Sequence, residues 1–540
     1  MKSFLQKWAL PALTLFTFFF LLGSRSLNEP DEGRYSEIAR EMVETGDWLV
    51  PHLWYVPHLD KPPMTYWLVA ASLKLFGQSE WTARLPVALA GISGVWAAFL
   101  LGCALGGRRV GIWSALLLQS ALLYFLLARM LTTDMFLTQF VAWAIYFFYR
   151  SWTCIQPSSA LRPWPFFGWH LAGWIFVAFA FLTKGPIAIA IPAVAFAVLA
   201  IVRRNEISWK LLLPGVVAGL AVFSILAVPW FLAVFAREPD SAHYMILGQA
   251  AGHLLGTTIK NRPGGIFYFF GILAVGLVPW TLLLGWLWRR AHWRSLDQRS
   301  RDGWLLLNTW AIFTFALFSL SQAKLPAYIL PIFPALAVML AMRFFREEDN
   351  VSIGPRTAWL ICLACAFLPP IIFPVALKVA FHDPLPTPLL WQMPVTAVLA
   401  LVFLWQGRKQ ALESVCASTI AIALLGYLLI AAELPAFETT LRGNQTFQPV
   451  GVALRDNFQP GDAVVCWGKF PQGLPFYSGL AICASNLPYL GRMDLTQVPF
   501  EFPGNRNRIG RRYLPDAKAL TPLLQGDRRV WVVAFGNTLD

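Results

Sequence analysis

Long apolar runs recur along the whole chain and are separated by short polar connections. Most of these runs approach the roughly 20 residues that a helix needs to cross the hydrocarbon core of a bilayer. The pattern therefore predicts about thirteen transmembrane helices. Their expected positions are 8–22, 84–105, 110–128, 134–150, 166–182, 186–202, 211–236, 265–288, 303–321, 325–345, 357–380, 390–406 and 411–432. A further apolar piece at 64–77 is short for a span.

Residues 25–80 form a long and mostly polar outer first loop. Within it, Pro30 suits the first position of a helix and Gly46 suits its end. One face of this helix carries an apolar stripe, which consists of Tyr35, Ile38, Ala39 and Met42. The opposite face consists of Ser36, Glu37, Arg40, Glu41 and Glu44. Asp31 falls on the apolar side, where it is either a first-turn acid favoured by the helix dipole or a functional carboxylate.

The tail, residues 433–540, has a different pattern. Short apolar runs at 463–467 and 530–535 predict buried strands, and 448–457 predicts a helix. We expect a small α/β domain here, since about a hundred residues are enough for a hydrophobic core. Residues 1–432 would then form the transmembrane domain.

Composition restricts the class of protein. The chain is 57% hydrophobic and contains 25 Trp and 42 Phe, which a soluble multidomain enzyme could not bury. The formal charge of +14 would suggest a nucleic-acid partner in a soluble protein. Here Lys and Arg concentrate in alternate connections between the spans, which places those connections in the cytoplasm. The prediction is an all-α polytopic protein of the bacterial inner membrane, with a cytoplasmic N-terminus, a periplasmic tail domain and no nucleic-acid partner.

The seven cysteines show no metal-ligand spacing. Cys466 and Cys483 both lie in the tail, where an environment outside the cytoplasm would permit a disulfide between them. The sequence leaves that pairing open, and it leaves the oligomeric state open as well.

Polar residues gather at the outer ends of the predicted spans and in the outer loops. They include Asp31, Glu32, Arg34, Asp60, Lys61, Asp134, Lys184, His243 and Lys324. Carboxylates together with several Lys and Arg on one membrane face suit chemistry on anionic phosphates. Each residue also has a structural explanation: a single Lys or Arg extends into the headgroups, Asp134 caps its helix, and Asp60 neutralises Lys61.

Five motifs resemble those of the aminoarabinose transferases that modify lipid A, which belong to the GT-C glycosyltransferases together with the protein O-mannosyltransferases. The motifs are Glu29–Ala39, Asp60-Lys61-Pro62-Pro63, Arg84-Leu85-Pro86, Lys324-Leu325-Pro326-x-Tyr328-x-Leu330-Pro331 and Gln472-Gly473-Leu474-Pro475-Phe476-Tyr477. The match covers the whole chain in order.

The resemblance implies a GT-C enzyme that moves 4-amino-4-deoxy-L-arabinose from undecaprenyl phosphate to a lipid A phosphate at the periplasmic face, with inversion. It implies that Asp31 and Asp134 line the active cavity, with Arg34 as a further catalytic residue. Lys61 would lie near the carrier phosphate. The other candidates for binding the carrier phosphate or the substrate are Lys184, Lys324, Tyr35 and Tyr328.

The resemblance leaves open whether the enzyme binds a divalent metal ion. The candidate ligands are Asp60 and His243, with His253 as an alternative to His243. The family more often has Glu where this chain has Asp60, and many relatives have a basic residue where it has Gln322. Another sugar, such as mannose or galacturonic acid, and a protein or glycan acceptor therefore remain alternatives. A transporter or a non-catalytic scaffold is more distant, since charges lie at span ends and no internal repeat is evident.

Overall fold

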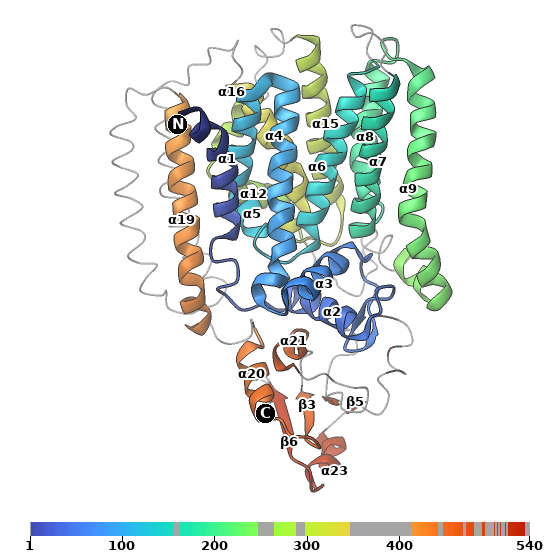
Figure 1. Ribbon diagram of the computed structural model, residues 1–540, viewed down its shortest axis with the longest axis vertical. Helices are drawn as coiled ribbons and strands as arrows, with labels where there is room; N and C mark the ends of the chain where they lie inside the picture. The colour runs from blue at the N-terminus through green and yellow to red at the C-terminus, as the bar shows by residue number, and fades with distance from the viewer. Residues whose placement is uncertain are drawn as a thin grey trace. The chain divides into compact units, whose positions relative to one another are not determined.

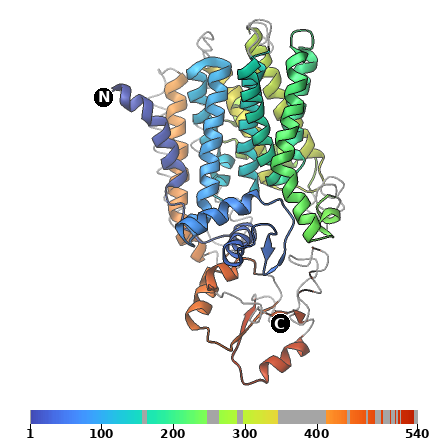
Figure 2. The same ribbon diagram turned by 45° about the vertical axis from the view of Figure 1, so that its right-hand side comes forward.

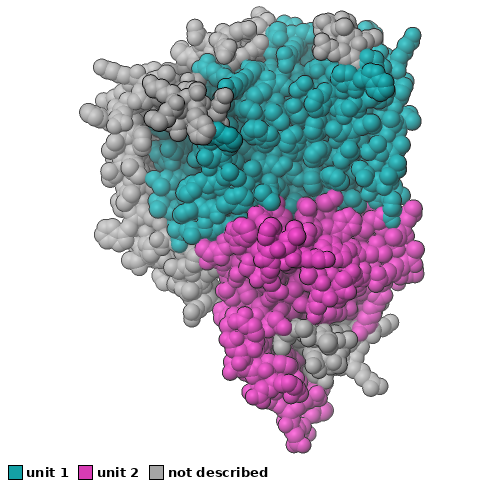
Figure 3. All heavy atoms as spheres, viewed as in Figure 1, with its two compact units in different colours: residues 1–22, 87–229, 262–441 teal, residues 23–86, 230–261, 442–540 magenta. Residues whose placement is uncertain are grey.

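The computed structural model describes residues 2–155, 163–246, 264–287, 297–345, 412–440, 446–467 and 471–479, with parts of 489–534. The predicted spans at 357–380 and 390–406 lie outside these residues, as do His253 and Cys483. The chain divides into two compact units, shown in Figure 3. Unit 1 consists of Met1–Leu22, Val87–Pro229 and Arg262–Leu441, and unit 2 of Gly23–Pro86, Trp230–Asn261 and Arg442–Asp540.

Unit 1 is built from long helices that run side by side in both ribbon views (Figures 1 and 2). The helices that lie wholly or mostly in it are α1 (Lys2–Phe19), α4 (Glu80–Gln119), α5 (Leu122–Leu127), α6 (Thr133–Trp152), α7 (Pro163–Lys184), α8 (Ile187–Val202), α9 (Trp209–Arg237), α12 (Tyr268–Gly276), α13 (Leu284–Leu287), α15 (Gln298–Leu320), α16 (Phe333–Phe344) and α19 (Leu412–Thr440). In the described part of the chain, five helices are long and apolar enough to cross a membrane. They are Glu80–Gln119, Pro163–Lys184, Trp209–Arg237, Gln298–Leu320 and Pro326–Phe344.

The helices follow the apolar runs closely, with one informative difference. Helix α4 consists of two helical segments that are separated at the non-helical Gly107 (φ 85°), which agrees with the break predicted between the spans 84–105 and 110–128, and α5 follows. The stretch 265–288, predicted as one span, is not one continuous helix. Here α12 ends at Gly276 and a short 3₁₀ helix, η2, follows at Thr281–Leu283. Pro279 lies between them and cannot donate the backbone hydrogen bond that would continue the helix.

Unit 2 begins with helix α2 (Asp31–Thr45), the strands β1 (His52–Leu53) and β2 (Val56–Pro57), and helix α3 (Met64–Phe76). The expected helix of the first loop is confirmed in α2. It starts directly after Pro30 and ends at the left-handed Gly46 (φ 72°), whose N–H donates to the Met42 carbonyl. Helix α3 packs against α2, and at 13 residues it is shorter than a span.

The predicted division of α2 into a buried and an exposed face is wrong. Ser36, Glu37 and Glu41 on the expected polar face are fully buried, and Arg40 is 8% exposed. Arg40 and Glu37 are tolerated inside because they pair with each other at 2.7 Å, and Glu41 accepts hydrogen bonds from backbone N–H groups. The Asp31 side chain, expected on the buried side, is 38% exposed.

The tail holds a four-stranded parallel sheet in the order β5-β4-β3-β6. The tail elements are α20 (Gln448–Asn457), β3 (Ala463–Trp467), α21 (Leu474–Ser478), β4 (Tyr489–Gly491), β5 (Tyr513–Leu514), η5 (Ala517–Leu520), α23 (Thr521–Leu524) and β6 (Val530–Ala534). The predicted helix at 448–457 and the strands at 463–467 and 530–535 are confirmed. Val465 of β3 packs with Leu514 and Leu523 in a small hydrophobic core.

Candidate active site

The first group of predicted site residues lies at the start of α2. Arg34 donates a hydrogen bond from Nη2 to Asp31 Oδ1, one helical turn earlier. The Arg34 guanidinium also lies over the Tyr35 ring, 5.2 Å from its centroid. Arg34 is buried while Asp31 keeps more than a third of its side chain exposed. Asp31 is therefore a carboxylate that is held by a cation and is still accessible to a ligand.

A buried ion triad fixes this first turn of α2. Glu32 accepts hydrogen bonds from Arg84 Nε and Nη2, both at 2.8 Å, and from Arg25 Nη1 at 2.7 Å. Burial alone would raise the pKa of Glu32, but the guanidinium groups of Arg25 and Arg84 outweigh it and hold this pKa well below its ordinary value. Sequence reasoning found Arg84 only as part of a motif and assigned Glu32 no partner. Only the fold shows that Glu32 and Arg84 are both buried, where two charges of opposite sign need each other.

The tail motif that resembles the family contacts the same end of α2. The Gly473 N–H donates to Glu29 Oε1 at 2.7 Å. The buried Tyr477 hydroxyl accepts a 2.6 Å hydrogen bond from the Leu27 N–H. The acceptor Glu29 and the donor Leu27 both lie just before α2. Helix α21 therefore anchors the segment that leads into the first turn of α2, which carries Asp31.

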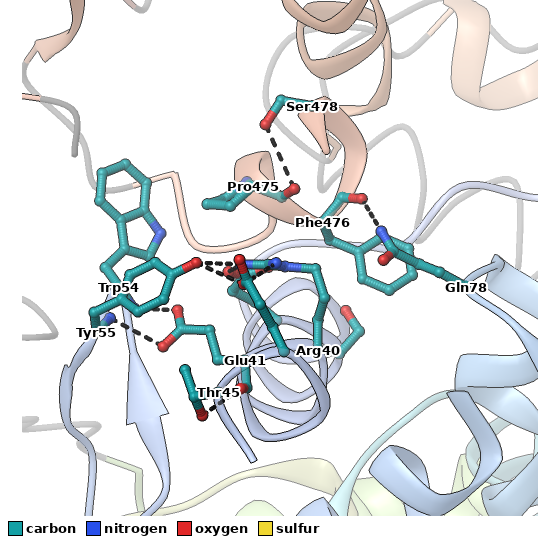
Figure 4. A network of polar contacts seen from close by, with 12 residues as sticks. Arg40, Glu41, Thr45, Trp54, Tyr55, Gln78, Pro475, Phe476 and Ser478 are labelled. Atoms are coloured by element: carbon teal, nitrogen blue, oxygen red, sulfur yellow. Dashed lines mark hydrogen bonds and ion pairs between the residues drawn. The ribbon is translucent and has the colours of Figure 1, made fainter. Parts of the chain in front are cut away.

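A second buried network connects α2 to the β1–β2 hairpin (Figure 4). The Glu41 carboxyl accepts hydrogen bonds from the backbone N–H groups of Trp54 at 2.6 Å and Tyr55 at 2.9 Å. Trp54 and Tyr55 have φ values of 57° and 58°, a left-handed conformation that is uncommon for such residues. Burial, and next the neighbouring Glu37, raise the pKa of Glu41 well above its ordinary value. Glu41 thus stabilises a strained turn a few residues before Asp60.

Asp60 and Lys61 follow this hairpin. Asp60 accepts a hydrogen bond from the Tyr244 hydroxyl, and the Nε2 atom of the buried His58 lies 3.7 Å from Asp60 Oδ2. Lys61 stands directly before Pro62 and Pro63, which lead into α3. Lys61 therefore precedes the N-terminus of α3, and the helix dipole favours an anionic ligand at that end.

The candidate metal ligands Asp60 and His243 are not joined in the described structure. His243 is exposed, and the contact from its loop to Asp60 comes from the neighbouring Tyr244. Among the residues that the structure describes, no three His, Cys, Asp or Glu side chains converge on one point. Asp60 with His58 is an incomplete donor set for a divalent cation.

The second group of predicted site residues lies in unit 1. Asp134, in the first turn of α6, is buried and accepts a hydrogen bond from Lys184 Nζ at the end of α7. The same ammonium lies 4.1 Å from the centroid of the Tyr328 ring, a cation–π contact. The structure thus brings together Asp134, Lys184 and Tyr328, which come from three separate segments. The helix-cap alternative for Asp134 finds no support in α6, whose N-cap, Thr132, has no side-chain hydrogen bond.

Lys324 has different partners. It is buried, and its ammonium donates to the backbone carbonyls of Ser319, at 3.0 Å, and Ser321. These carbonyls lie at the end of α15, where a cation is favourable. The described contacts therefore give Lys324 a role at a helix terminus, and its predicted role in substrate binding stays a prediction.

Comparison with known proteins identifies the family. Residues 60–231 match the model of the dolichyl-phosphate-mannose-protein mannosyltransferase family. Over 490 residues the chain is 30% identical to an undecaprenyl phosphate-alpha-4-amino-4-deoxy-L-arabinose arabinosyl transferase of Aeromonas salmonicida (strain A449), and the alignment covers 86% of this chain and 84% of that protein. The chain belongs to this arabinosyl transferase family.

Two further relatives agree with this membership. The arabinosyl transferase of the same description from Aeromonas hydrophila is 32% identical over 366 residues, which cover 66% of this chain and 63% of that protein. The crystal structure of ArnT from Cupriavidus metallidurans bound to undecaprenyl phosphate has a TM-score of 0.77 and 26% sequence identity, covering 98% of this chain and 93% of that one. The resemblance inferred from the motifs is therefore confirmed. This arabinosyl transferase family member is a helical, multi-pass membrane glycosyltransferase.

Proposed function

We propose that this chain transfers 4-amino-4-deoxy-L-arabinose from undecaprenyl phosphate to a phosphate of lipid A at the periplasmic face of the bacterial inner membrane. The observation that carries the proposal is the alignment over 84% of a relative named for this donor and sugar. The similarity over nearly the whole chain to an ArnT structure bound to undecaprenyl phosphate supports the same carrier.

The donor chemistry explains why cations are needed. When the bond between the sugar and the carrier breaks, the leaving group is a phosphate monoester that gains negative charge. Lys61 at the start of α3 and Arg34 beside Asp31 are suited to stabilise this charge. A single displacement at the anomeric carbon inverts its configuration.

The acceptor decides what the carboxylates must do. A lipid A phosphate is already an anion near neutral pH, so it needs no strong general base to attack. Asp31 and Asp134 then orient groups or stabilise the positive charge that develops on the sugar. A hydroxyl acceptor would instead require one of the two carboxylates to take a proton.

The proposal extends to the membrane topology of the protein. The protein then has about thirteen membrane-spanning helices, a cytoplasmic N-terminus and a periplasmic tail domain that contains the four-stranded sheet. Five helices among the described residues that are long and apolar enough to span, and the Lys- and Arg-rich alternate connections, support this topology. Cysteine labelling of single sites on each side of the membrane would test this arrangement.

The activity can be tested with purified protein in detergent, undecaprenyl phosphate-linked aminoarabinose and lipid A. Mass spectrometry should detect lipid A that has gained one aminopentose. Parallel reactions with carriers of mannose or galacturonic acid test the alternative sugars, to which the match with a mannosyltransferase model gives some support. Product from one of these carriers and none from the aminoarabinose carrier would refute the proposed sugar.

A further inference from the structure

Tyr66 carries a buried hydroxyl that the described structure does not satisfy. The side chain is fully buried in the first turn of α3, and its hydroxyl has no hydrogen-bond partner among the described residues. The Tyr66 ring lies 5.8 Å, centroid to centroid, from the ring of Tyr35 on α2. The unsatisfied hydroxyl is therefore held next to the helix that carries Asp31 and Arg34.

The surroundings of Tyr66 keep this hydroxyl neutral. Burial, and next the Tyr35 phenol and the Asp60 carboxylate, raise the pKa of Tyr66 well above its ordinary value. Arg34 lowers the pKa of Tyr66, whereas Asp31 raises it, as Asp60 does. Tyr66 is thus a phenol that can both donate and accept a hydrogen bond at any working pH.

A second buried donor lies on the same pair of helices. Arg34 uses Nη2 for Asp31, while its buried Nε atom has no hydrogen-bond partner among the described residues. Arg34 and Tyr66 interact electrostatically, so the two unsatisfied groups belong to one neighbourhood. An unsatisfied buried polar group costs free energy, and a ligand that supplies the missing partner removes that cost.

We propose that the Tyr66 hydroxyl forms a hydrogen bond with a hydroxyl group of the donor sugar and so contributes to recognition of that sugar. The inference rests on the proposed function. The carrier phosphate is attracted to Lys61 and Arg34, whereas the carboxylates Asp31 and Asp60 around Tyr66 repel it. A sugar hydroxyl suits this position, because it can accept from the phenol and donate to a carboxylate.

The test compares Tyr66→Phe with Tyr124→Phe in the full-length protein. Tyr124 is also fully buried, but its hydroxyl donates to the Gly91 carbonyl at 2.8 Å. Tyr66→Phe should keep or raise the Tm in detergent and lower kcat/KM for the aminoarabinose carrier roughly threefold to tenfold, the range of one neutral hydrogen bond. Binding of undecaprenyl phosphate without sugar should not change. Tyr124→Phe should lower the Tm and keep the kcat/KM of the folded protein.

Three results would overturn the inference. An unchanged kcat/KM in Tyr66→Phe would show that the hydroxyl does not contact the sugar. An equal loss of binding for undecaprenyl phosphate without sugar would assign the contact to the carrier. A lowered Tm would show that the hydroxyl has a partner within the protein. An inactive wild-type protein with this donor is a separate result, which refutes the proposed function and the sugar contact with it.

Discussion

Gly33 and Gly473 lie against each other within unit 2, although one is in the first-loop motif and the other in the tail motif. A Cβ atom on Gly473 would lie 2.8 Å from Gly33 Cα, and one on Gly33 would lie 3.1 Å from the Gly473 nitrogen. Gly33 is helical and Gly473 has φ −95°, so neither position requires glycine for its backbone angles. The two glycines are needed because the backbones approach closely. The first-loop and tail motifs thus form one contact.

We expect Gly473→Ala to destabilise the protein by about 1–3 kcal/mol, because the new methyl group would collide with the α2 backbone. Transfer activity should fall as well, since α2 carries Asp31 and Arg34. Thermal unfolding in detergent and the lipid A transfer assay would measure the two effects. Gly526→Ala is the matched control, because its Cβ would come no closer than 3.7 Å to the atoms around it. Equal Tm and activity in the two variants would disprove the role of the glycine contact.

Asp31→Asn should abolish transfer while leaving the protein folded. Asparagine keeps the size of the side chain and an oxygen that can accept a hydrogen bond from Arg34, and the charge that it removes belongs to a side chain that is 38% exposed. Loss of the carboxylate should lower the transfer rate by at least about a hundredfold if it stabilises charge or positions the acceptor. Asp456→Asn, which removes an exposed aspartate next to Arg455, is the control. Undiminished product from Asp31→Asn would remove Asp31 from the catalytic residues.

The helices were predictable because their signal is local. The apolar stripe and the end at Gly46 define α2 without reference to the rest of the chain. Burial of the opposite face was not predictable from the same pattern. The partners of Glu41 are backbone N–H groups of a hairpin, and those of Glu32 are Arg25 and Arg84, the latter on another helix. Such partners depend on the tertiary fold, so helical periodicity alone assigns these carboxylates to solvent.

The candidate site was predictable as a set of residues more than as a set of contacts. Asp134 and Lys184 were selected by their positions at the outer ends of predicted spans and Tyr328 by its motif, but only the fold places the Lys184 ammonium between the Asp134 carboxylate and the Tyr328 ring. Lys324 was also selected at the outer end of a predicted span, but its ammonium contacts the backbone carbonyls at the end of α15. Tyr66 was missed because an unsatisfied hydroxyl can be recognised only when its neighbours are known.

Lys184→Met should destabilise unit 1 by about 3–5 kcal/mol, because it leaves the buried Asp134 carboxylate without its cation. Asp134→Asn in the same background should recover a large part of this loss, since no uncompensated charge remains. Thermal unfolding of the wild type, both single variants and the double variant gives the coupling energy. Lys518→Met, at an exposed position, controls for loss of a lysine charge. Additive effects of the two substitutions would mean that the pair is not coupled.

Glu41→Gln should change how stability depends on pH. The pKa of Glu41 in the folded protein is raised above its ordinary value of 4.5, so the ionised form is the unfavourable one. The contribution of Glu41 to stability is therefore fully present below pH 4.5 and is lost as pH rises through the raised pKa of the folded state. Glutamine cannot ionise and keeps an oxygen that accepts from the turn at Trp54 and Tyr55. The difference in Tm between Glu41→Gln and the wild type should thus shift in favour of the variant as pH rises from 4.5, and unfolding in detergent at a series of pH values would measure it. A constant difference, or one that shifts in favour of the wild type, would show that Glu41 is ionised in the folded protein and that Arg40 compensates its charge.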